Sequence, residues 1–329
     1  MLRAISILLS LICLAAGCAH VDAQERYPSR LVKIIVPYGP GGATDIVARV
    51  LADQLKDSLG QTFLIENKPG AYGIIADQEL ARANPDGYTL MIGNVSTNAI
   101  TPILYARKIP SYEKDVVPVM RLVDVPAFLI ATTKEFPPRS VAEFIDYAKA
   151  NPGKVNYGTV GVGSYPHYDM ALLAKRAGDL NMAGIPNKNG ATGVINDMLT
   201  GSVQVGFLNV ASTAGMIKAG KLRALATVNH ARLADYPDVP TMDEVGFPGV
   251  GTIAWQGLFA PAGTPQDVLE TIRAAMAEAL QQPAVMHMFD QQSFNIVPTS
   301  SLDEAKIWLA DEINNWRKIT EEVKIDITE

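Results

Sequence analysis

Residues that could bind an anion stand in a glycine-rich turn near the start of the chain, Pro37-Tyr38-Gly39-Pro40-Gly41-Gly42-Ala43-Thr44-Asp45. The turn follows a β-branched run and precedes a helical pattern, so its free backbone N–H groups would stand at a helix N-terminus and favour negative charge. It lacks the lysine of a Walker loop and the glycine spacing of a dinucleotide site. An ordinary tight loop explains the glycines equally well. As a carboxylate site, it would use Tyr38, Gly41, Gly42, Ala43, Thr44 and Asp45.

A second glycine-rich turn, residues 157–167, also follows a strand-like run and opens a helical one. It offers a second anion site, with Gly163, Ser164 and His167 as candidates. Ser164 and His167 could instead be a nucleophile and its base. The chain has no Gly-x-Ser-x-Gly elbow, however, and neither His230 nor His287 has an acidic partner at an orienting spacing. We therefore expect no catalytic residue.

Polar side chains follow two further strand-like runs: Asn94, Ser96 and Thr97 after one, and Asn209 after the other. In open α/β sheets, ligands bind beyond the carboxyl ends of the strands. These side chains, together with Asn187, could thus add neutral hydroxyls and amides to the same crevice. Capping of the next helix explains at least one of Ser96 and Thr97 equally well. The acidic residues show no calcium-loop spacing, so we expect no metal and no cofactor.

Short apolar runs alternate with amphipathic ones, which predicts an α/β fold with mostly parallel sheets flanked by helices. The series occurs twice, each time with a glycine-rich strand-to-helix turn. This predicts two lobes, one formed by residues 24–124 with 236–329 and the other by residues 125–235. The expected strands are 32–36, 62–65, 88–92, 120–133, 155–157, 203–208 and 222–228. The expected helices are 46–59, 74–83, 99–105, 141–150, 168–176, 194–199, 265–281, 283–289 and 301–323, the last three packing on the first lobe.

The first residues are typical of an export signal. One positive charge precedes an apolar stretch too short to span a bilayer, and small residues end at Ala23, so residues 1–23 are a predicted signal peptide. Acylation of Cys18 in a lipobox-like sequence is the alternative. Cys13 and Cys18 are the only cysteines, which excludes a disulfide framework in the body of the chain. The net charge of −6 over 329 residues and the 7% aromatic content disfavour nucleic-acid binding.

Ordered sequence blocks along nearly the whole mature chain match one family. They are Ile34-Ile35-Val36-Pro37-Tyr38-Gly39-Pro40-Gly41-Gly42-Ala43-Thr44-Asp45, Glu66-Asn67-Lys68-Pro69-Gly70-Ala71, Pro85-Asp86-Gly87-Tyr88-Thr89-Leu90, Tyr157-Gly158-Thr159-Val160-Gly161, Asp238-Val239-Pro240-Thr241 and Gly257-Leu258-Phe259-Ala260-Pro261-Ala262-Gly263-Thr264-Pro265. In these blocks the chain resembles the solute receptors of tripartite tricarboxylate transporters, often called Bug receptors. The resemblance implies a two-lobed, type II-like periplasmic-binding-protein clamshell without enzymatic activity. Such a receptor grips a small-molecule carboxylate between its lobes and delivers it to membrane permease subunits; we expect a periplasmic monomer.

The chain departs from the family pattern where a ligand's variable end would lie. Pro186-Asn187-Lys188-Asn189-Gly190 stands where the family usually has Pro-Tyr-Lys-Gly, and Asn209 stands near a frequent aspartate. The ligand's identity therefore does not carry over. Tyr38, Tyr72, Tyr165 and Tyr168 near the loops favour an aromatic or longer-chain dicarboxylate over citrate, although they could equally pack the lobe edges. Two other functions stay open: an exported hydrolase using Ser164 and His167, and a sensory receptor of the same fold.

Overall fold

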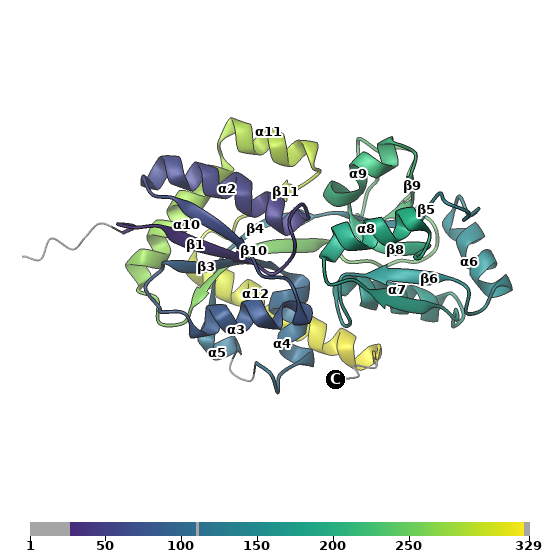
Figure 1. Cartoon of the computed structure of the whole chain (residues 1–329), viewed down its shortest axis with the longest axis horizontal. Helices are drawn as coiled ribbons and strands as arrows, with labels where there is room; N and C mark the ends of the chain where they lie inside the picture. Colours follow the sequence, from purple (N-terminus) through teal and green to yellow (C-terminus); the bar gives the residue numbers. More distant parts are fainter. Residues whose placement is uncertain (1–26, 110–111, 326–329) are drawn as a thin grey trace, which may run out of the picture.

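The computed structural model describes residues 27–109 and 112–325, which form two α/β lobes lying side by side (Figure 1). The predicted signal peptide, its cleavage site and both cysteines lie outside the described residues. None of the helices in the described ranges is long and apolar enough to cross a membrane. The predicted two-lobed α/β architecture is confirmed, with one sheet in each lobe.

The first lobe contains a six-stranded sheet in the order β11-β4-β10-β3-β1-β2. Its strands are β1 (Val32–Val36), β2 (Phe63–Asn67), β3 (Thr89–Asn94), β4 (Val116–Val125), β10 (Ala254–Pro261) and β11 (Asn295–Ile296). Strand β1 pairs in parallel with β2 and β3; parallel strands need a crossover connection, which the helices after β1 and β2 provide. Strand β10, which the sequence pattern left unassigned, runs antiparallel between β3 and β4. The sheet is therefore mixed, although most of its strands run in one direction.

Helices from both ends of the sequence cover the first sheet. They are α2 (Ala43–Leu59), α3 (Ile74–Arg82), α4 (Thr101–Leu104), α5 (Tyr112–Asp115), α10 (Gln266–Leu280), α11 (Pro283–Gln291) and α12 (Leu302–Glu322), with the short turns η1 (Ala71–Gly73) and η2 (Ser96–Ile100). As predicted, the last three helices return to this lobe, where Ile272, Phe289 and Trp316 share one core with β1. Helix α2 ends at Gly60, whose φ of 70° is the left-handed conformation that glycine adopts without strain.

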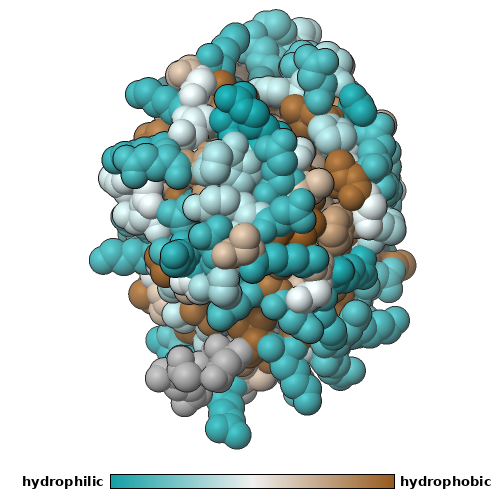
Figure 2. All heavy atoms as spheres, turned by 90° about the vertical axis from the view of Figure 1, so that its right-hand side faces the viewer, coloured by the Kyte–Doolittle hydropathy of each residue, from teal (hydrophilic) through white to brown (hydrophobic). Residues whose placement is uncertain are grey.

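The second lobe contains a five-stranded sheet in the order β7-β6-β8-β5-β9. Its elements are β5 (Ala127–Thr132), α6 (Val141–Ala150), β6 (Asn156–Thr159), α7 (Tyr165–Arg176), β7 (Ala183–Pro186), α8 (Gly190–Thr200), β8 (Val205–Asn209), α9 (Val210–Lys218) and β9 (Leu222–Thr227). Strands β6, β7 and β8 are parallel, and β5 is antiparallel to both of its neighbours. Separate apolar cores lie on its two faces. Figure 2 looks onto the end of this lobe, where hydrophilic groups cover most of the surface.

The chain crosses between the lobes twice. Pro126 divides the predicted run 120–133 into β4 and β5, because proline cannot donate a ladder hydrogen bond. The return crossing falls between β9 and β10, and Met242 and Val250 in this segment pack in a core of the second lobe. The boundary predicted at 235/236 lies inside the return segment, and the lobe limits stay a prediction. Helix α7 lies at the contact between lobes, since Tyr165 packs in the first lobe's core.

Candidate functional site

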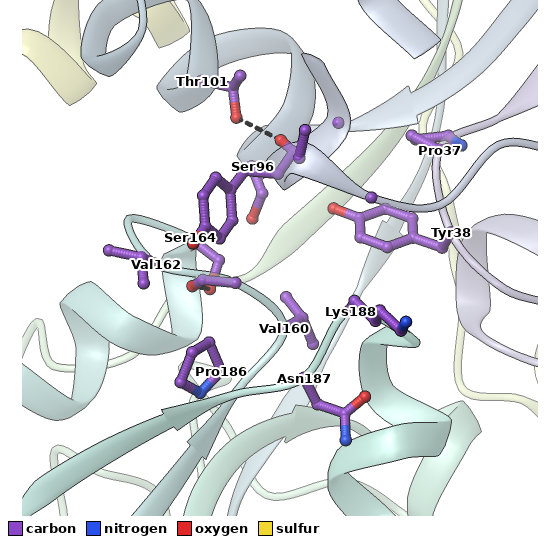
Figure 3. Close-up of a pocket in the computed structure, with 15 residues that line it drawn as sticks. Pro37, Tyr38, Ser96, Thr101, Val160, Val162, Ser164, Pro186, Asn187 and Lys188 are labelled. Carbon is purple, nitrogen blue, oxygen red and sulfur yellow. Dashed lines mark hydrogen bonds between the residues drawn. The ribbon is translucent and has the colours of Figure 1, made fainter. Parts of the chain in front are cut away.

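A cavity of about 250 Å³ lies between the lobes, beyond the carboxyl ends of β1, β3 and β6. Figure 3 shows Pro37, Tyr38, Ser96 and Thr101 of the first lobe facing second-lobe residues across this space. The first lobe contributes Pro37, Tyr38, Gly70, Ala71, Tyr72, Gly73, Ser96 and Thr101. The second contributes Val160, Gly161, Val162, Ser164, Pro186, Asn187 and Lys188. Placement beyond the strand ends is what an open α/β sheet predicts for a ligand site.

A smaller compartment of about 30 Å³ adjoins the cavity, and Tyr38 and Val160 line both. Its walls are Tyr38, Gly39, Gly42, Ala43, Thr44, Asn94, Val125, Val160, Tyr165, Asn189, Ala191, Asn209, Ala254 and Gln256. Its volume suits a carboxylate group or one or two water molecules. None of these described lining residues carries a charge. Hydroxyls, amides and the N-terminal end of α2 therefore define its polarity.

Tyr38 separates the two compartments and is held from several directions. Its hydroxyl donates to Oδ1 of Asn94 at 3.0 Å, and its carbonyl accepts from Nδ2 of Asn67 at 2.9 Å. Burial raises the pKa of Tyr38, so the hydroxyl stays protonated and able to donate. On the opposite lobe, Gly190 adopts a φ of 69° and a Cβ there would lie 3.3 Å from the Tyr38 ring. The ring is thus a fixed partition.

Polar side chains from three strands and from helix α2 meet in the small compartment. Thr44 Oγ1 donates to Oε1 of Gln256 at 2.8 Å, and Asn94 Nδ2 donates to Thr44 Oγ1 at 3.5 Å. Asn94 Oδ1 also accepts the backbone N–H of Ser96. Asn209 is the N-cap of α9 and accepts from the backbone N–H of Ser212. This network orients neutral donors without introducing a counter-charge.

Asp45, predicted as a ligand contact, lines neither compartment. Arg49 donates two hydrogen bonds of 2.9 Å to its carboxylate, and the backbone N–H of Gly41 and the amide of Asn67 donate others. Burial alone would raise the pKa of Asp45, but these hydrogen bonds outweigh it and hold the pKa below its ordinary value. The Asp45 carboxylate is therefore paired inside the first lobe, where its hydrogen bond from the backbone N–H of Gly41 holds the glycine-rich turn in place.

Ser164 and His167 do not form a hydrogen-bonded nucleophile–base pair. The Ser164 hydroxyl donates to the carbonyl of Gly161 at 2.7 Å, and His167 Nδ1 accepts the backbone N–H of Gly163. Burial lowers the pKa of His167 to about 4, so the ring is neutral at physiological pH. Ser164 lines the cavity, whereas His167 packs behind it against Tyr157. The arrangement favours binding over proton transfer.

The predicted site residues divide into two groups. Those that line a compartment are Tyr38, Gly42, Ala43, Thr44, Asn94, Ser96, Ser164, Asn187 and Asn209. Those that support the lining are Gly41, Asp45, Thr97, Gly163 and His167. Among the tyrosines, Tyr38, Tyr72 and Tyr165 line the compartments, whereas Tyr168 packs in the first lobe's core.

Other lining residues escaped the sequence analysis. Gln256 is buried in β10. In the sequence it is the single polar side chain within the apolar run 253–261, and this pattern could have indicated its role. Gly70, Ala71 and Gly73 lie in a turn beyond β2 of which only Tyr72 was predicted to lie near the crevice, because the Pro69-Gly70 dipeptide marks a turn but not its direction. Lys188 is the only cation among the described lining residues of the larger cavity.

The lobes touch directly around the cavity. The backbone N–H of Tyr165 donates to Ser96 Oγ at 3.1 Å across the cleft. A Cβ at Gly39 would lie 3.6 Å from the carbonyl oxygen of Asn189, and one at Gly161 would lie 2.8 Å from the Tyr72 ring. A ligand between the lobes would therefore be enclosed from both sides.

Two α/β lobes joined by two crossings, with an enclosed polar cavity between them, define a bilobed solute-binding protein. The chain belongs to the tripartite tricarboxylate transporter receptor family, whose model matches residues 47–325.

Named relatives and solved structures agree with this placement. Protein BugT of Bordetella pertussis is 35% identical over 309 residues, covering 93% of each chain. The structure of Rpa4515 of R. palustris with adipate has a TM-score of 0.86 at 29% identity and covers 91% of this chain and 99% of that one. MatC of Rhodopseudomonas palustris with bound malate has a TM-score of 0.83 at 31% identity, with 89% and 99% covered.

Proposed function

We propose that this protein captures a small organic carboxylate between its lobes and delivers it to the membrane permease subunits of a tripartite tricarboxylate transporter. Family membership supports the transport role. The observation that carries the ligand class is the small, neutral compartment at the N-terminal end of α2. That 17-residue helix has no side-chain cap on Gly42, so its first N–H groups remain available to an anion.

The carboxylate would be held by neutral donors. Thr44, Asn94, Asn209 and Gln256 surround the compartment, and none of the described lining residues is acidic and able to repel the anion. Hydrogen bonds to an ionised group are about twice as strong as neutral ones, so a few oriented donors suffice without a salt bridge. The first carboxylate of the ligand therefore belongs in this compartment.

The larger cavity receives the rest of the ligand. Pro37, Tyr38, Tyr72, Val160 and Pro186 form an apolar part of its wall, and Lys188 lines it as a partner for a second carboxylate. An apolar stretch of wall with one cation fits an aromatic or longer-chain dicarboxylate better than citrate, whose hydrated groups would lose water against it. Adipate and malate are the ligands of two related structures, and both are dicarboxylates.

A thermal-shift panel of mono-, di- and tricarboxylates tests the ligand class. A ligand that binds only the folded protein raises the melting temperature by mass action. At least one acid should give a strong shift, whereas nucleotides and sugars should give none. A shift with nucleotides or sugars alone would reject the carboxylate assignment.

Calorimetric titration of terephthalate, adipate and citrate against wild type and Tyr38→Ala tests the ligand's shape. We expect the dicarboxylates to bind more tightly than citrate and to lose affinity in Tyr38→Ala, because the partition that positions them is gone. Tighter citrate binding that ignores the substitution contradicts the preference.

The N-terminal segment determines how the protein is exported. We propose that the signal peptide is cleaved after Ala23 and that the mature receptor is a periplasmic monomer. The mass of the protein recovered from the periplasm distinguishes cleavage there from acylation at Cys18, and its sedimentation gives the oligomeric state.

A further inference from the structure

A turn with unusual backbone geometry forms one wall of the larger cavity. Residues 70–73 all have positive φ, at 120° for Gly70, 45° for Ala71, 59° for Tyr72 and 91° for Gly73. Glycine adopts such angles freely, but a large aromatic residue adopts them at a cost. A strained residue persists only where the surroundings hold it, and such residues cluster at functional sites.

Tyr72 is held from three directions. Its ring stacks on that of Tyr105, with centroids 5.4 Å apart and planes 12° from parallel. Its carbonyl accepts from Thr101 Oγ1 at 2.9 Å, the bond drawn as a dashed line in Figure 3. Across the cleft, Gly161 leaves room for the ring, since a Cβ there would approach it to 2.8 Å. The ring therefore has one position when the lobes touch.

The ring is nevertheless left open where the cavity lies. Tyr72 keeps 40% of its surface exposed, although Tyr105 beneath it is buried. It lines the larger cavity and is absent from the lining of the small compartment. Strain, support and an exposed aromatic surface thus coincide at one residue that faces the ligand's body rather than its anchored carboxylate.

We propose that Tyr72 is the specificity-determining residue of the larger cavity, selecting ligands whose carbon body is flat or extended enough to pack against its ring. This inference rests on the proposed carboxylate-binding function and deepens it. An aromatic ring packed on a second one gains attraction beyond the area buried. A short, hydrated acid anchored beside α2 gains little from the same surface.

Tyr72→Gly tests the proposal without threatening the fold. Glycine adopts these backbone angles without strain, and the strain removed offsets the loss of ring stacking on Tyr105. The melting temperature without ligand should therefore stay within about 2 °C of wild type. Affinity should fall about three- to tenfold for terephthalate, less for adipate and least for malate. Tyr72→Phe should bind all three like wild type, because it keeps the ring.

Asp179→Gly is the matched control, because Asp179 also has a positive φ, of 58°, and lies exposed outside the cavity lining. It should leave all three affinities unchanged. A double-mutant cycle with Gly161→Ala adds a cross-lobe test: the methyl should weaken binding by displacing the ring and should cost less in the Tyr72→Gly background. Because Gly161→Ala is made in both backgrounds, the backbone strain of alanine at position 161 is subtracted in the double-mutant cycle.

The outcomes separate the two proposals. If wild type binds none of the acids, the carboxylate function fails and the role of Tyr72 fails with it. If wild type binds an acid and Tyr72→Gly binds every acid equally well, the function stands and the Tyr72 proposal is overturned. An equal loss for malate, adipate and terephthalate also overturns it, because Tyr72 would then not discriminate between ligand bodies.

Discussion

Asp77 on α3 is fully buried, and within the described residues neither of its carboxyl oxygens has a hydrogen-bond partner. Desolvation raises the pKa of Asp77 well above its ordinary value, so the buried group favours its protonated form. Tyr38 and Tyr112 lie close enough for their pKa values to respond to its charge. One hidden carboxyl thus links the stability of the first lobe to pH.

Asp77→Asn should remove this link. A group whose pKa is raised on folding stabilises the protein most below its unfolded pKa, about 3.9, and that contribution is lost as pH rises through the folded pKa. The unfolding free energy of wild type relative to the variant should therefore fall above pH 4, by at most about 1.4 kcal/mol per pH unit.

Urea unfolding at a series of pH values between 4 and 8 measures this difference. Asp53→Asn, at an exposed position on α2, controls for the loss of one negative charge. A difference between wild type and Asp77→Asn that stays constant over this range contradicts the prediction.

How far single residues could be predicted depended on the backbone pattern around them. Thr44, Asn94 and Ser164 follow strands, and a strand-end position alone indicated that they face a crevice. Gln256 and Tyr72 could not be placed this way. The lining role of Gln256 depends on an antiparallel strand inserted between β3 and β4, and that of Tyr72 on four consecutive positive φ values. The first is a property of the whole sheet and the second of the backbone of one turn, and a strand-end position indicates neither.

Among the elements, the N-terminal end of α2 should matter more for binding than the lone lysine. A Cβ at Gly42 meets nothing within 4 Å, so the side chain of Gly42→Val would project into free space beside the small compartment that Gly42 lines. We expect more than a tenfold loss of carboxylate affinity in Gly42→Val and less than a threefold loss in Lys188→Ala, because backbone donors need close approach.

Calorimetry on both variants decides between these anchors. Valine is a poor N-cap, so melting curves without ligand must first show that Gly42→Val folds, and Gly42→Ser provides a better-capped variant with a small side chain. Equal or reversed losses would identify Lys188 as the principal anchor.

Helices were predicted best where the hydrophobic periodicity and the residues that start or stop a helix marked the same bounds. Helices α6, α10 and α12 lie close to their expected bounds, and in the structure the side chains of Ser140 and Ser301 cap two of them. Helix α9 was missed because Val210, Ser212, Thr213 and Gly215 have low helix propensity and outnumber the two alanines between them. Packing against β8 and β9 stabilises it instead.

The whole molecule offers a direct test of lobe closure. A Cβ on Gly39 would lie 4.0 Å from the Cα of Asn189 on the opposite lobe, so a cross-link between these two positions reports their approach. Expressed from Gln24, the chain contains no other thiol. Both residues line the small compartment, so the test is made without ligand: the double variant Gly39→Cys/Asn189→Cys should form an internal disulfide under mild oxidation if the lobes close as described.

Loss of free thiols and mobility on non-reducing gels report the cross-link, with each single cysteine variant as a control against intermolecular pairing. No internal disulfide would contradict the close approach of positions 39 and 189 in solution.

The position of β10 between β3 and β4 also sets the order in which the lobes can be completed during synthesis. Every strand of the second sheet lies between residues 127 and 227, so that sheet is available as soon as this segment has been made. The first sheet must wait for residues 254–261, and until then the facing edges of β3 and β4 lack their shared partner. The N-terminal lobe is therefore the later of the two to mature, and its unpaired strand edges are the part of a nascent chain most in need of protection from aggregation.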